Sequence, residues 1–347
     1  MRNPRNNDRR LTMRTQRCFL FIVLILFLMT LISFGQEMVF QYYFPTEAML
    51  KQDIYLKFGN GLACDQSGNV WVVDSGEGKL LKFDPAGRFL KKVGRKGQGP
   101  GEFSRPGTIH ISEDGDLLVL DDVNMRINIL SAEGEFKRGI KLLRRYEDFC
   151  VSKGKIYLVY NGPREDGKTV DVFSLNGDPL GSLGEAPDFG PVIPDLARMA
   201  NFKVISCDPD GRLLVGWTFF SILHILDPDQ KETTAKIEID DPRLKERYHH
   251  NLKQLNSQEP EIWRVVHRSR AHQNGILALI SGEKGIEILD VDLTGKVRAI
   301  YWAPNPEEEQ YVGRYFVFRK DGNTVWIYIL QIMPESKVNV YKIETQL

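Results

Sequence analysis

Six short hairpin turns recur along the chain, each between two apolar runs, and this repeat limits the possible folds more than any other feature. In the first five units a second turn follows the first at a nearly constant offset, so that Gly87 comes 19 residues after Gly68 and Gly134 comes 19 residues after Gly115. Units with four short strands and two tight turns are typical of β-propellers. The first turns are Ser67-Gly68, Asp114-Gly115, Lys153-Gly154, Asp210-Gly211, Asn274-Gly275 and Asp321-Gly322.

The strand after each first turn is apolar on both faces, as in NVWVVD at 69–74 and DLLVLD at 116–121. A sheet with one wet face would alternate apolar and polar residues, whereas a near-continuous apolar strand suits a sheet that is covered on both sides. A closed ring covers every sheet in this way, while an open stack leaves two end units exposed. The sequence therefore predicts an all-β fold, a six-bladed β-propeller with four antiparallel strands in each blade.

The last unit contains three strand-like runs, at 315–318, 324–330 and 337–343, and lacks a fourth. An aromatic, β-prone segment at 37–44 precedes the first unit and has no partner there. We expect this N-terminal strand to pair with the last blade as its outer strand. Such pairing closes the ring and covers two sheet edges that would otherwise invite aggregation.

Two insertions interrupt the repeat, at 185–202 and 240–264, and both fall between blades. The first is predicted to be an irregular loop ending in one helical turn. The second has the helical spacing of Leu244, Tyr248 and Leu252. Connections between blades emerge on the same face as the loops that join second and third strands. Because long loops on a rigid scaffold commonly carry binding, this inter-blade loop face is the predicted binding face.

The N-terminal 35 residues have the pattern of a targeting segment. Six arginines are followed by Cys18–Phe34, a run of 17 residues without charge, and Ser33 and Gly35 are small residues at cleavage-site spacing. The sequence predicts a signal peptide at 1–35 and a propeller domain at 36–347. An uncleaved N-terminal anchor is the alternative, since about 17 apolar residues just span a bilayer. The domain is expected to be exported, either periplasmic or extracellular.

The charge balance bears on the choice of partner. The chain has 46 basic and 46 acidic residues, and removal of six arginines and Asp8 with residues 1–35 leaves 40 and 45, a net charge of −5. A mildly acidic domain has no general attraction to nucleic acid or anionic lipid. We therefore expect no nucleic acid and no membrane contact beyond the N-terminal segment, and we expect a monomer.

One stretch carries a family resemblance. GxxGxGPGEFxxP at 94–106 is followed by a strand, a D-G turn, LLVLDDVNMRINIL and an E-G turn. This stretch resembles an NHL repeat, and the domain resembles the six-bladed NHL-type β-propellers of exported bacterial proteins. Asn124 and Arg126 match the N-x-R element of the family in the second unit, whereas the first unit lacks it. The resemblance implies the propeller fold. It leaves function open, because such propellers bind proteins, peptides, glycans or RNA and in a few cases are lyases.

Three cysteines, Cys64, Cys150 and Cys207, each precede a turn glycine by four residues and so occupy equivalent positions in their units. The other units have apolar residues at this position, which indicates packing. Equivalent positions on adjacent sheets are expected to lie about 10 Å apart, beyond the reach of a disulfide. The expectation is three free, unreactive thiols.

The sequence contains no residue pattern that is typical of a catalytic or metal site. His110 and His267 fall in first strands near the predicted channel, yet no HxH, HExxH or CxxC pair is present. Asp74 and Asp121 end second strands, where carboxylates commonly accept backbone N–H bonds, and Arg126 is expected to pair with Asp121 or with a neighbouring blade.

We therefore predict no catalytic residue, no metal site and no cofactor. The predicted function is that of a non-catalytic binding or scaffold propeller in the cell envelope. The alternative is a divalent-metal-dependent lyase or hydrolase, similar to lactonases or amidating lyases, with its site in the central channel.

Candidates for the binding face combine positive charge with aromatic surface, a combination enriched at recognition sites. They predict a protein, peptide or glycan partner, and ordinary solvated loops are the alternative. The charged candidates are Arg95, Lys96, Arg105, Arg126, Arg144, Arg145 and Arg164. The aromatic candidates are Trp217, Phe219, Phe220, Trp302 and Tyr311.

Overall fold

A computed structural model describes residues 35–208, 210–272, 275–282, 285–304, 312–333 and 335–344. The predicted signal peptide therefore lies outside the described residues except for Gly35. The chain divides into two units, Met1–Gly35 and Gln36–Leu347, and the fold below is that of the second unit. Over the described ranges, no helix is both long and apolar enough to cross a membrane.

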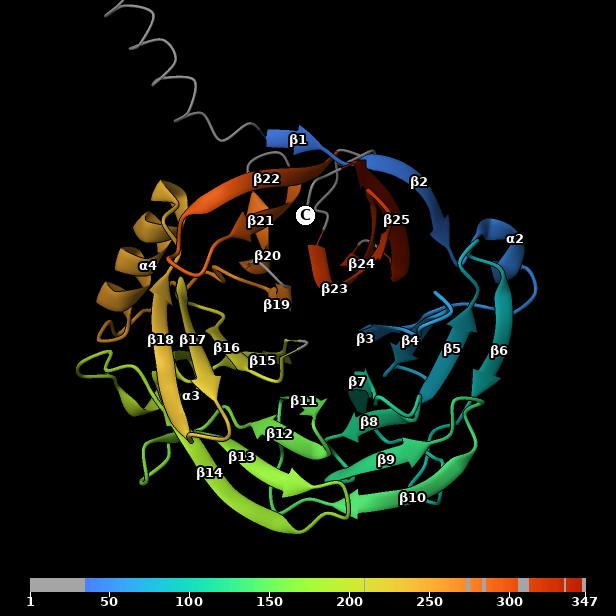
Figure 1. Cartoon of the computed structure of the whole chain (residues 1–347), viewed down its shortest axis with the longest axis horizontal. Helices are drawn as coiled ribbons and strands as arrows, with labels where there is room; N and C mark the ends of the chain where they lie inside the picture. Colours follow the sequence, from blue (N-terminus) through green and yellow to red (C-terminus); the bar gives the residue numbers. More distant parts are fainter. Residues whose placement is uncertain are drawn as a thin grey trace, which may run out of the picture. The chain divides into compact units, whose positions relative to one another are not determined.

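Six antiparallel sheets are arranged in a ring around a central channel, and the innermost strand of each sheet lines that channel (Figure 1). This is the predicted six-bladed β-propeller. From the channel outward, blade 1 contains β3 (Gly59–Cys64), β4 (Val70–Asp74), β5 (Lys79–Phe83) and β6 (Phe89–Val93). Blade 2 contains β7 (Pro106–Ile111), β8 (Leu117–Asp121), β9 (Arg126–Leu130) and β10 (Phe136–Lys141). Blade 3 contains β11 (Asp148–Ser152), β12 (Lys155–Val159), β13 (Lys168–Ser174) and β14 (Pro179–Glu185).

The remaining blades follow the same order, with additions from the N-terminal segment. Blade 4 contains β15 (Lys203–Cys207), β16 (Leu213–Trp217), β17 (Ile222–Asp227) and β18 (Glu232–Glu238). Blade 5 contains β19 (Arg268–His272), β20 (Gly275–Gly282), β21 (Gly285–Val291) and β22 (Val297–Pro304), with β1 (Gly35–Glu37) beside β22. Blade 6 contains β23 (Val312–Asp321), β24 (Thr324–Met333), β25 (Lys337–Glu344) and, as its outer strand, β2 (Val39–Phe44).

The N-terminal strand closes the ring, as predicted. β2 runs antiparallel to β25, with Val39 opposite Lys342 and Phe44 opposite Val338. The side chain of Phe44 is fully buried, and its ring lies 4.4 Å from that of Phe83 in the next blade. The segment therefore joins the last blade to the first both by backbone pairing and by packing.

The core lies between neighbouring blades. Every residue of β4, β8 and β16 is buried, which confirms that the second strands are covered on both faces. One cluster packs Trp71 and Val73 of blade 1 against Ile109 and Val119 of blade 2. Because each blade buries its faces against its neighbours, the fold depends on closure of the whole ring.

Short helices occupy the connections. They are α2 (Glu47–Leu50), η1 (Pro194–Leu196), α3 (Ala197–Ala200) and α4 (Pro242–Gln254). Asp241 is the N-cap of α4, and its carboxylate accepts hydrogen bonds from the N–H groups of Arg243 and Leu244. Leu244 is buried, and Tyr248 and Leu252 pack against the core, in agreement with the predicted spacing.

Two aspartates fix the loops that enter the channel. The carboxylate of Asp74 accepts hydrogen bonds from the N–H groups of Lys57 and Phe58, each at 3.0 Å. Asp121 does the same for Ser104 and Arg105, at 2.9 and 3.0 Å. The capping role predicted for both aspartates is confirmed. The incoming connection of each of these blades is thereby held at the end of its second strand.

Candidate functional site

A buried polar cluster crosses the middle of the channel. Arg268 on β19 forms an ion pair with Asp148 on β11, and both residues are buried. The hydroxyl of Thr108 donates to Asp148 at 2.8 Å, and the N–H of Ile205 donates to its second oxygen at 2.9 Å. The guanidinium of Arg268 also lies 4.1 Å from the ring centre of Tyr315. The cluster therefore joins blades 2 to 6 through one carboxylate and one guanidinium.

Cavities lie on both sides of this cluster. One is lined by residues at the starts of innermost strands, such as Asn60, Gly107 and Arg314, and has a volume of about 340 Å³. The other is lined by residues at the ends of those strands, such as Cys64 and Ile111, and has a volume of about 260 Å³. The first, here called the mouth cavity, lies at the inter-blade loop face. The second, here called the turn-side cavity, lies at the end formed by the first hairpin turns.

The mouth cavity combines arginine, acidic and aromatic side chains. A small extension of about 20 Å³ shares Glu147, Arg314 and Tyr315 with it. The other side chains of the mouth cavity are those of Phe58, Asn60, Ser75, Arg105, Leu120, Asp122, Tyr146 and Arg198. The extension adds Phe202, Val204, Arg264, His267 and Arg268. All six blades contribute, through their innermost strands, the connections that lead into them or, for Ser75, Leu120 and Asp122, the ends of second strands, so only the closed ring assembles the site.

The arginines of the mouth cavity differ in how they are neutralised. Arg105 donates through Nε to Asp122 at 2.8 Å and forms a second bond to the same carboxylate. In contrast, no ion pair among the described residues involves Arg198, Arg264 or Arg314. Burial, together with the charge of Arg314, lowers the pKa of Arg264. The cavity therefore carries positive charge that the described carboxylates leave unpaired.

Aromatic rings lie against the guanidinium groups of Arg264 and Arg314. The guanidinium of Arg264 lies 5.2 Å from the ring centre of Phe202 and 5.6 Å from that of Phe219. Arg314 lies 5.5 Å from the ring centre of Phe58. Stacking of this kind holds the plane of a guanidinium while its N–H groups stay available for a ligand.

Two titratable groups complete the mouth. Burial and the neighbouring charge of Asp148 raise the pKa of Glu147, although Arg198 among others opposes this. Burial and the charges of Arg264, Arg247 and Arg314 lower the pKa of His267 to about 3. His267 is therefore a neutral imidazole at neutral pH, with Nε2 hydrogen-bonded to the hydroxyl of Ser281 at 2.8 Å.

Most of the predicted binding-face arginines are engaged in the loops rather than directed to the cavity. Of the charged candidates, only Arg105 lines the mouth cavity. Arg95 pairs with Glu102, and Lys96 donates to the carbonyl of Gly76 at 3.3 Å. Arg164 pairs with Asp166 and Asp171. Arg144 lies over the ring of Tyr160, and Arg145 is exposed.

Arg126 has the structural role that was expected, with different partners. Its guanidinium donates to the carbonyls of Gln98 and Gly99, each at 2.8 Å, and of Glu102 at 2.7 Å. It therefore holds the glycine-rich loop at 94–105 in place. The carboxylate of Asp121 is instead engaged by Asn124, whose amide donates to it at 2.7 Å.

The aromatic candidates require a correction. Trp217, Phe219 and Phe220 are buried, because the second strand of blade 4 and the residues after it pack beneath the connections of blades 3 and 4. They supply no exposed aromatic surface. Trp302 is half-buried on β22, and Tyr311 lies outside the described residues. The aromatic rings that do line the mouth cavity are those of Phe58, Tyr146 and Tyr315.

The residues that define the cavity were missed from the sequence. Arg198 belongs to α3, Arg264 precedes β19 and Arg314 lies on β23. Their only common feature in the sequence is their place at or just before the start of an innermost strand. Propeller geometry brings those starts together, and it becomes a usable signal only once the strands are aligned blade by blade.

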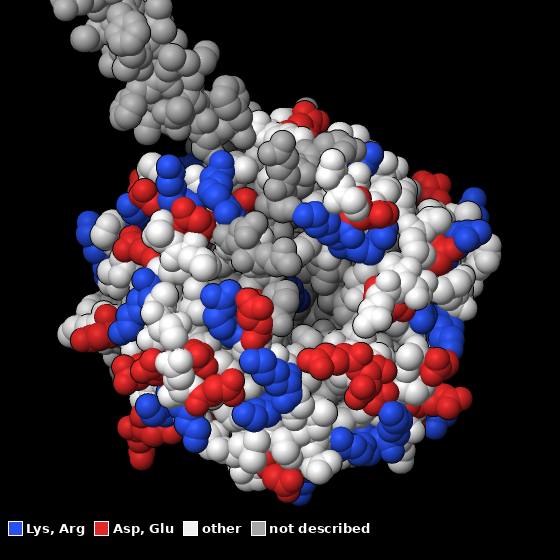
Figure 2. All heavy atoms as spheres, in the orientation of Figure 1, with Lys and Arg blue, Asp and Glu red and all other residues white. Residues whose placement is uncertain are grey.

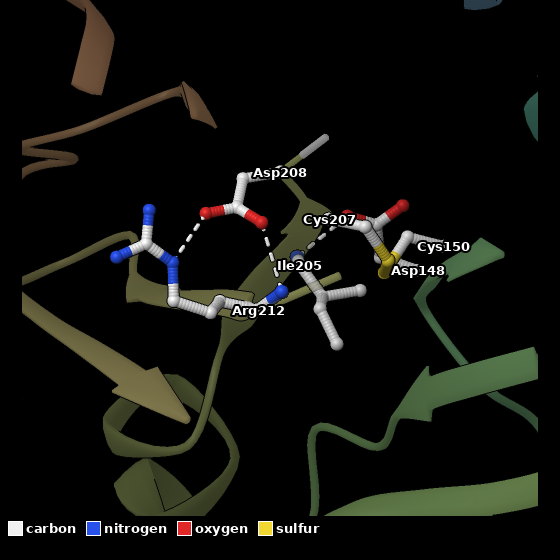
Figure 3. Close-up of a disulfide and its surroundings, with 6 residues drawn as sticks. All are labelled: Asp148, Cys150, Ile205, Cys207, Asp208 and Arg212. Carbon is white, nitrogen blue, oxygen red and sulfur yellow. Dashed lines mark hydrogen bonds and ion pairs between the residues drawn. A yellow bond between two sulfur atoms is a disulfide. The ribbon is translucent and has the colours of Figure 1, made fainter. Parts of the chain in front are cut away.

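The expectation of three free thiols was wrong. Cys150 on β11 and Cys207 on β15 form a disulfide, with Cα atoms 5.9 Å apart (Figure 3). The distance of about 10 Å applies to sheets packed face to face, whereas innermost strands of adjacent blades converge at the channel. The N–H of Ile205 donates a hydrogen bond to the carboxylate of Asp148. Each of these two residues lies two positions before the cysteine of its strand, so this hydrogen bond and the disulfide lie side by side (Figure 3).

Cys64 is the free cysteine of the described chain, and burial raises the pKa of its thiol to about 11. A thiol with this pKa is protonated at neutral pH and unreactive. The expectation is therefore met at this one position.

The histidines near the channel do not form a metal site with the acidic groups around them. His110 lies on β7 and lines the turn-side cavity, while His267 lines the extension of the mouth cavity. Within the described part of the chain, no three His, Cys, Asp or Glu side chains come together in a way that could hold a metal ion.

Comparison with known proteins agrees with this architecture. A family model described as "6-bladed beta-propeller" matches residues 60–173. The chain folds as a six-bladed β-propeller. A protein from Bacteroides fragilis NCTC 9343 named as an exported protein superimposes with a TM-score of 0.58 at 10% sequence identity, over 89% of this chain and 95% of that chain.

Two further similarities are to proteins with known names. Streptogramin B lyase superimposes with a TM-score of 0.51 at 13% identity, over 88% of this chain and 87% of that chain. Human E3 ubiquitin-protein ligase TRIM32 is 41% identical over 49 residues, which are 14% of this chain and 8% of the relative. At these identities the structural similarities establish the fold alone, and the chain matches only a small part of the curated relative.

Proposed function

We propose that the domain is a non-catalytic binding protein of the cell envelope, and that its mouth cavity holds a carboxylate of a peptide or glycan partner. One observation carries this proposal: Arg198, Arg264 and Arg314 line one connected cavity, and no ion pair among the described residues involves them. The carboxylate of Glu147 lies in the same cavity, but it is one acidic group against three guanidinium groups. Charge that is partly removed from water without a partner costs free energy, and an incoming carboxylate would offset that cost.

The shape and lining of the cavity support a bound group rather than a flat contact. Its volume of about 340 Å³ is within the lower range of ligand pockets, roughly 300–1,000 Å³. Arginine binds carboxylates through two parallel N–H bonds, and Tyr146 and Tyr315 offer rings for an apolar side chain or a sugar face. The face drawn in Figure 2 has acidic and basic side chains interspersed, with no broad area of one sign.

Export is part of the proposal. The arginine-rich start, the uncharged run Cys18–Phe34 and the small residues Ser33 and Gly35 support a signal peptide, with an anchor as the alternative. The disulfide suits an oxidising compartment, where such bonds persist. The structural similarity to a protein named as exported is in keeping with this location. The motif at 94–134 further supports a propeller of the NHL type.

Binding assays with paired ligands test the proposed site. Wild-type domain is titrated by calorimetry with polygalacturonate and with poly-glutamate, and with dextran and poly-glutamine as uncharged counterparts. We expect one of the two acidic polymers to bind and both uncharged ones to fail. The variant Arg198→Gln/Arg314→Gln should weaken that binding by about tenfold or more, which corresponds to about 1.4 kcal/mol. Arg145→Gln is the matched control, because Arg145 is exposed and lies outside the cavity.

The outcomes separate the proposal from its alternatives. An equal loss of affinity in the cavity variant and in Arg145→Gln would indicate a general charge effect. If neither acidic polymer bound to the wild-type domain, the carboxylate site would be rejected. The lyase or hydrolase alternative is tested in parallel by metal analysis of the purified domain. One equivalent of zinc or calcium, together with cleavage of a polymer that stops on chelation, would replace the binding function with an enzymatic one.

A further inference from the structure

The turn-side cavity lies on the opposite side of the Arg268–Asp148 pair from the mouth cavity and has its own lining. Its volume is about 260 Å³, which is room for a small organic molecule rather than a single water. The residues that line it are Leu62, Ala63, Cys64, Ile109, His110, Ile111, Ser206, Cys207, Arg270, Val317 and Phe318. Most of these side chains are apolar, although polar and apolar atoms contribute to the accessible wall in similar measure, and Arg270 is the charged residue among them.

Arg270 places a positive charge against this wall without an acidic partner. Its Nε donates to the carbonyl of Phe316 at 3.5 Å, which is long for a hydrogen bond. The nearby carboxylate of Asp148 is already bound to Arg268, and no ion pair among the described residues involves Arg270. Burial and the charge of Arg268 lower the pKa of Arg270 to about 10, so the guanidinium stays charged at neutral pH.

Two further polar atoms in the cavity wall have no partner. The hydroxyl oxygen of Ser206 is buried without a hydrogen bond, and Ser206 as a whole is 3% exposed. The Nδ1 atom of His110 is likewise buried without a hydrogen-bond partner. Burial together with the charge of Arg270 lowers the pKa of His110 to about 4, so its ring is neutral at neutral pH and can donate from one nitrogen. Unsatisfied buried groups of this kind are rare in native proteins and call for an explanation.

We propose that the turn-side cavity is a binding site for a small carboxylic acid with an apolar body. The carboxylate would bind the guanidinium of Arg270 and accept hydrogen bonds from the hydroxyl of Ser206 and the ring of His110. The apolar body would contact Leu62, Ile109 and Phe318. This site is separate from the mouth cavity, and its existence does not depend on the function proposed for that face.

The ligand class follows from matching the wall to the polar groups. An inorganic anion would satisfy Arg270 but would leave the apolar wall against water. A neutral apolar molecule would cover the wall but would leave three polar groups unsatisfied, which is costly in a buried site. Only an acid with an apolar body would both bind the polar groups and cover the apolar wall.

The test uses the intact exported domain and three probes of similar size or charge. Hexanoate, hexanamide and inorganic phosphate are each titrated by calorimetry in the same buffer. We expect saturable binding of hexanoate and binding of hexanamide at least about tenfold weaker, with no binding of phosphate. Equal affinity for acid and amide would overturn the proposal, as would binding of phosphate but not hexanoate, or no binding of hexanoate.

Variants assign the binding to this cavity. Arg270→Met keeps the length of the side chain and removes the charge, and should weaken hexanoate binding at least about tenfold. Arg145→Gln is the matched control and should bind hexanoate as the wild type does, because Arg145 is exposed and lines neither cavity. If Arg270→Met does not fold, Ser206→Ala serves in its place, with an expected loss of several-fold. Retained wild-type affinity in the folded variant, or the same loss in Arg145→Gln, would overturn the assignment.

Discussion

Arg268 of blade 5 and Asp148 of blade 3 form an ion pair across the central channel, and both side chains are almost fully buried. The two residues belong to blades that are not neighbours in the ring, because blade 4 lies between blades 3 and 5. Asp148 also accepts hydrogen bonds from Thr108 of blade 2 and Ile205 of blade 4. One carboxylate thus holds three other blades, and the channel is divided into two cavities at this level.

Removal of one partner of this pair should destabilise the whole ring. We expect Asp148→Asn to lower the free energy of unfolding by about 3–5 kcal/mol, because it leaves the buried guanidinium of Arg268 without a countercharge. Urea denaturation followed by tryptophan fluorescence measures this. Asp84→Asn is the matched control, since its partner Arg88 is largely exposed, and a loss below about 1 kcal/mol is expected from the ion pair there. Equal losses in the two variants would contradict a special role for the channel pair.

The disulfide should contribute a second large share of stability. It closes a loop of 57 residues, for which chain entropy predicts about 4 kcal/mol, within the usual range for native disulfides. We expect Cys150→Ser/Cys207→Ser to lower the free energy of unfolding by about 2–4 kcal/mol, and the wild type in reductant to show the same decrease. Cys64→Ser is the control, because Cys64 is free. Alkylation of the denatured, unreduced domain should modify Cys64 only, and modification of all three cysteines would contradict the bond.

The sequence predicted most of the fold because the fold is a repeat. Turn glycines such as Gly68 and Gly115 adopt φ values of 81° and 83°, and these positions punctuate the strands clearly enough to count six units. The outer strand of blade 6 was predicted from an edge that needed a partner. The turn glycines are a local signal, and the N-terminal strand follows from the need to pair a sheet edge. Both can be recognised in a single sequence.

The site was harder to predict, because it depends on distances across the ring. Cys150 and Cys207 were assigned to separate sheets at face-to-face spacing, but the blades converge at the channel, where their Cα atoms are 5.9 Å apart. Trp217 was expected on the surface and is buried, since a connection covers the end of its strand. Arg264 and Arg314 are 50 residues apart in sequence, and only the closed ring makes them neighbours.

The N-terminal strand should be essential to stability. Deletion of Glu37–Pro45 removes β2 from blade 6 and exposes two blade edges, so we expect aggregation or a large loss of thermal stability. A milder change isolates the packing: Phe44→Ala should cost about 3–5 kcal/mol, because this ring is fully buried. Val39→Ala on the same strand is the control, with an expected change within about 0.5 kcal/mol, since Val39 is exposed. A soluble deletion variant with unchanged melting temperature would contradict closure by this strand.

Buried histidines should make the domain sensitive to acid. Burial is the main cause that lowers the pKa of His110 and His224 to about 4 and of His267 to about 3, from an ordinary value of 6.5. Between the folded and the unfolded pKa the unfolded chain binds more protons, so the free energy of unfolding falls as the pH falls. The contribution of these groups is therefore fully present above pH 6.5 and is lost progressively toward pH 4.

A single variant isolates one such histidine. Each contributes a slope of up to about 1.4 kcal/mol per pH unit, so His224→Phe should reduce the slope of stability against pH by up to that amount in the same window. Phenylalanine keeps a ring beside Trp217, whose ring centre lies 4.6 Å from that of His224. Urea titrations at a series of pH values measure both slopes, and aspartates and glutamates contribute equally to the two proteins. Parallel curves for wild type and variant would show that His224 has the same pKa in the folded and unfolded states, against the expectation from its burial.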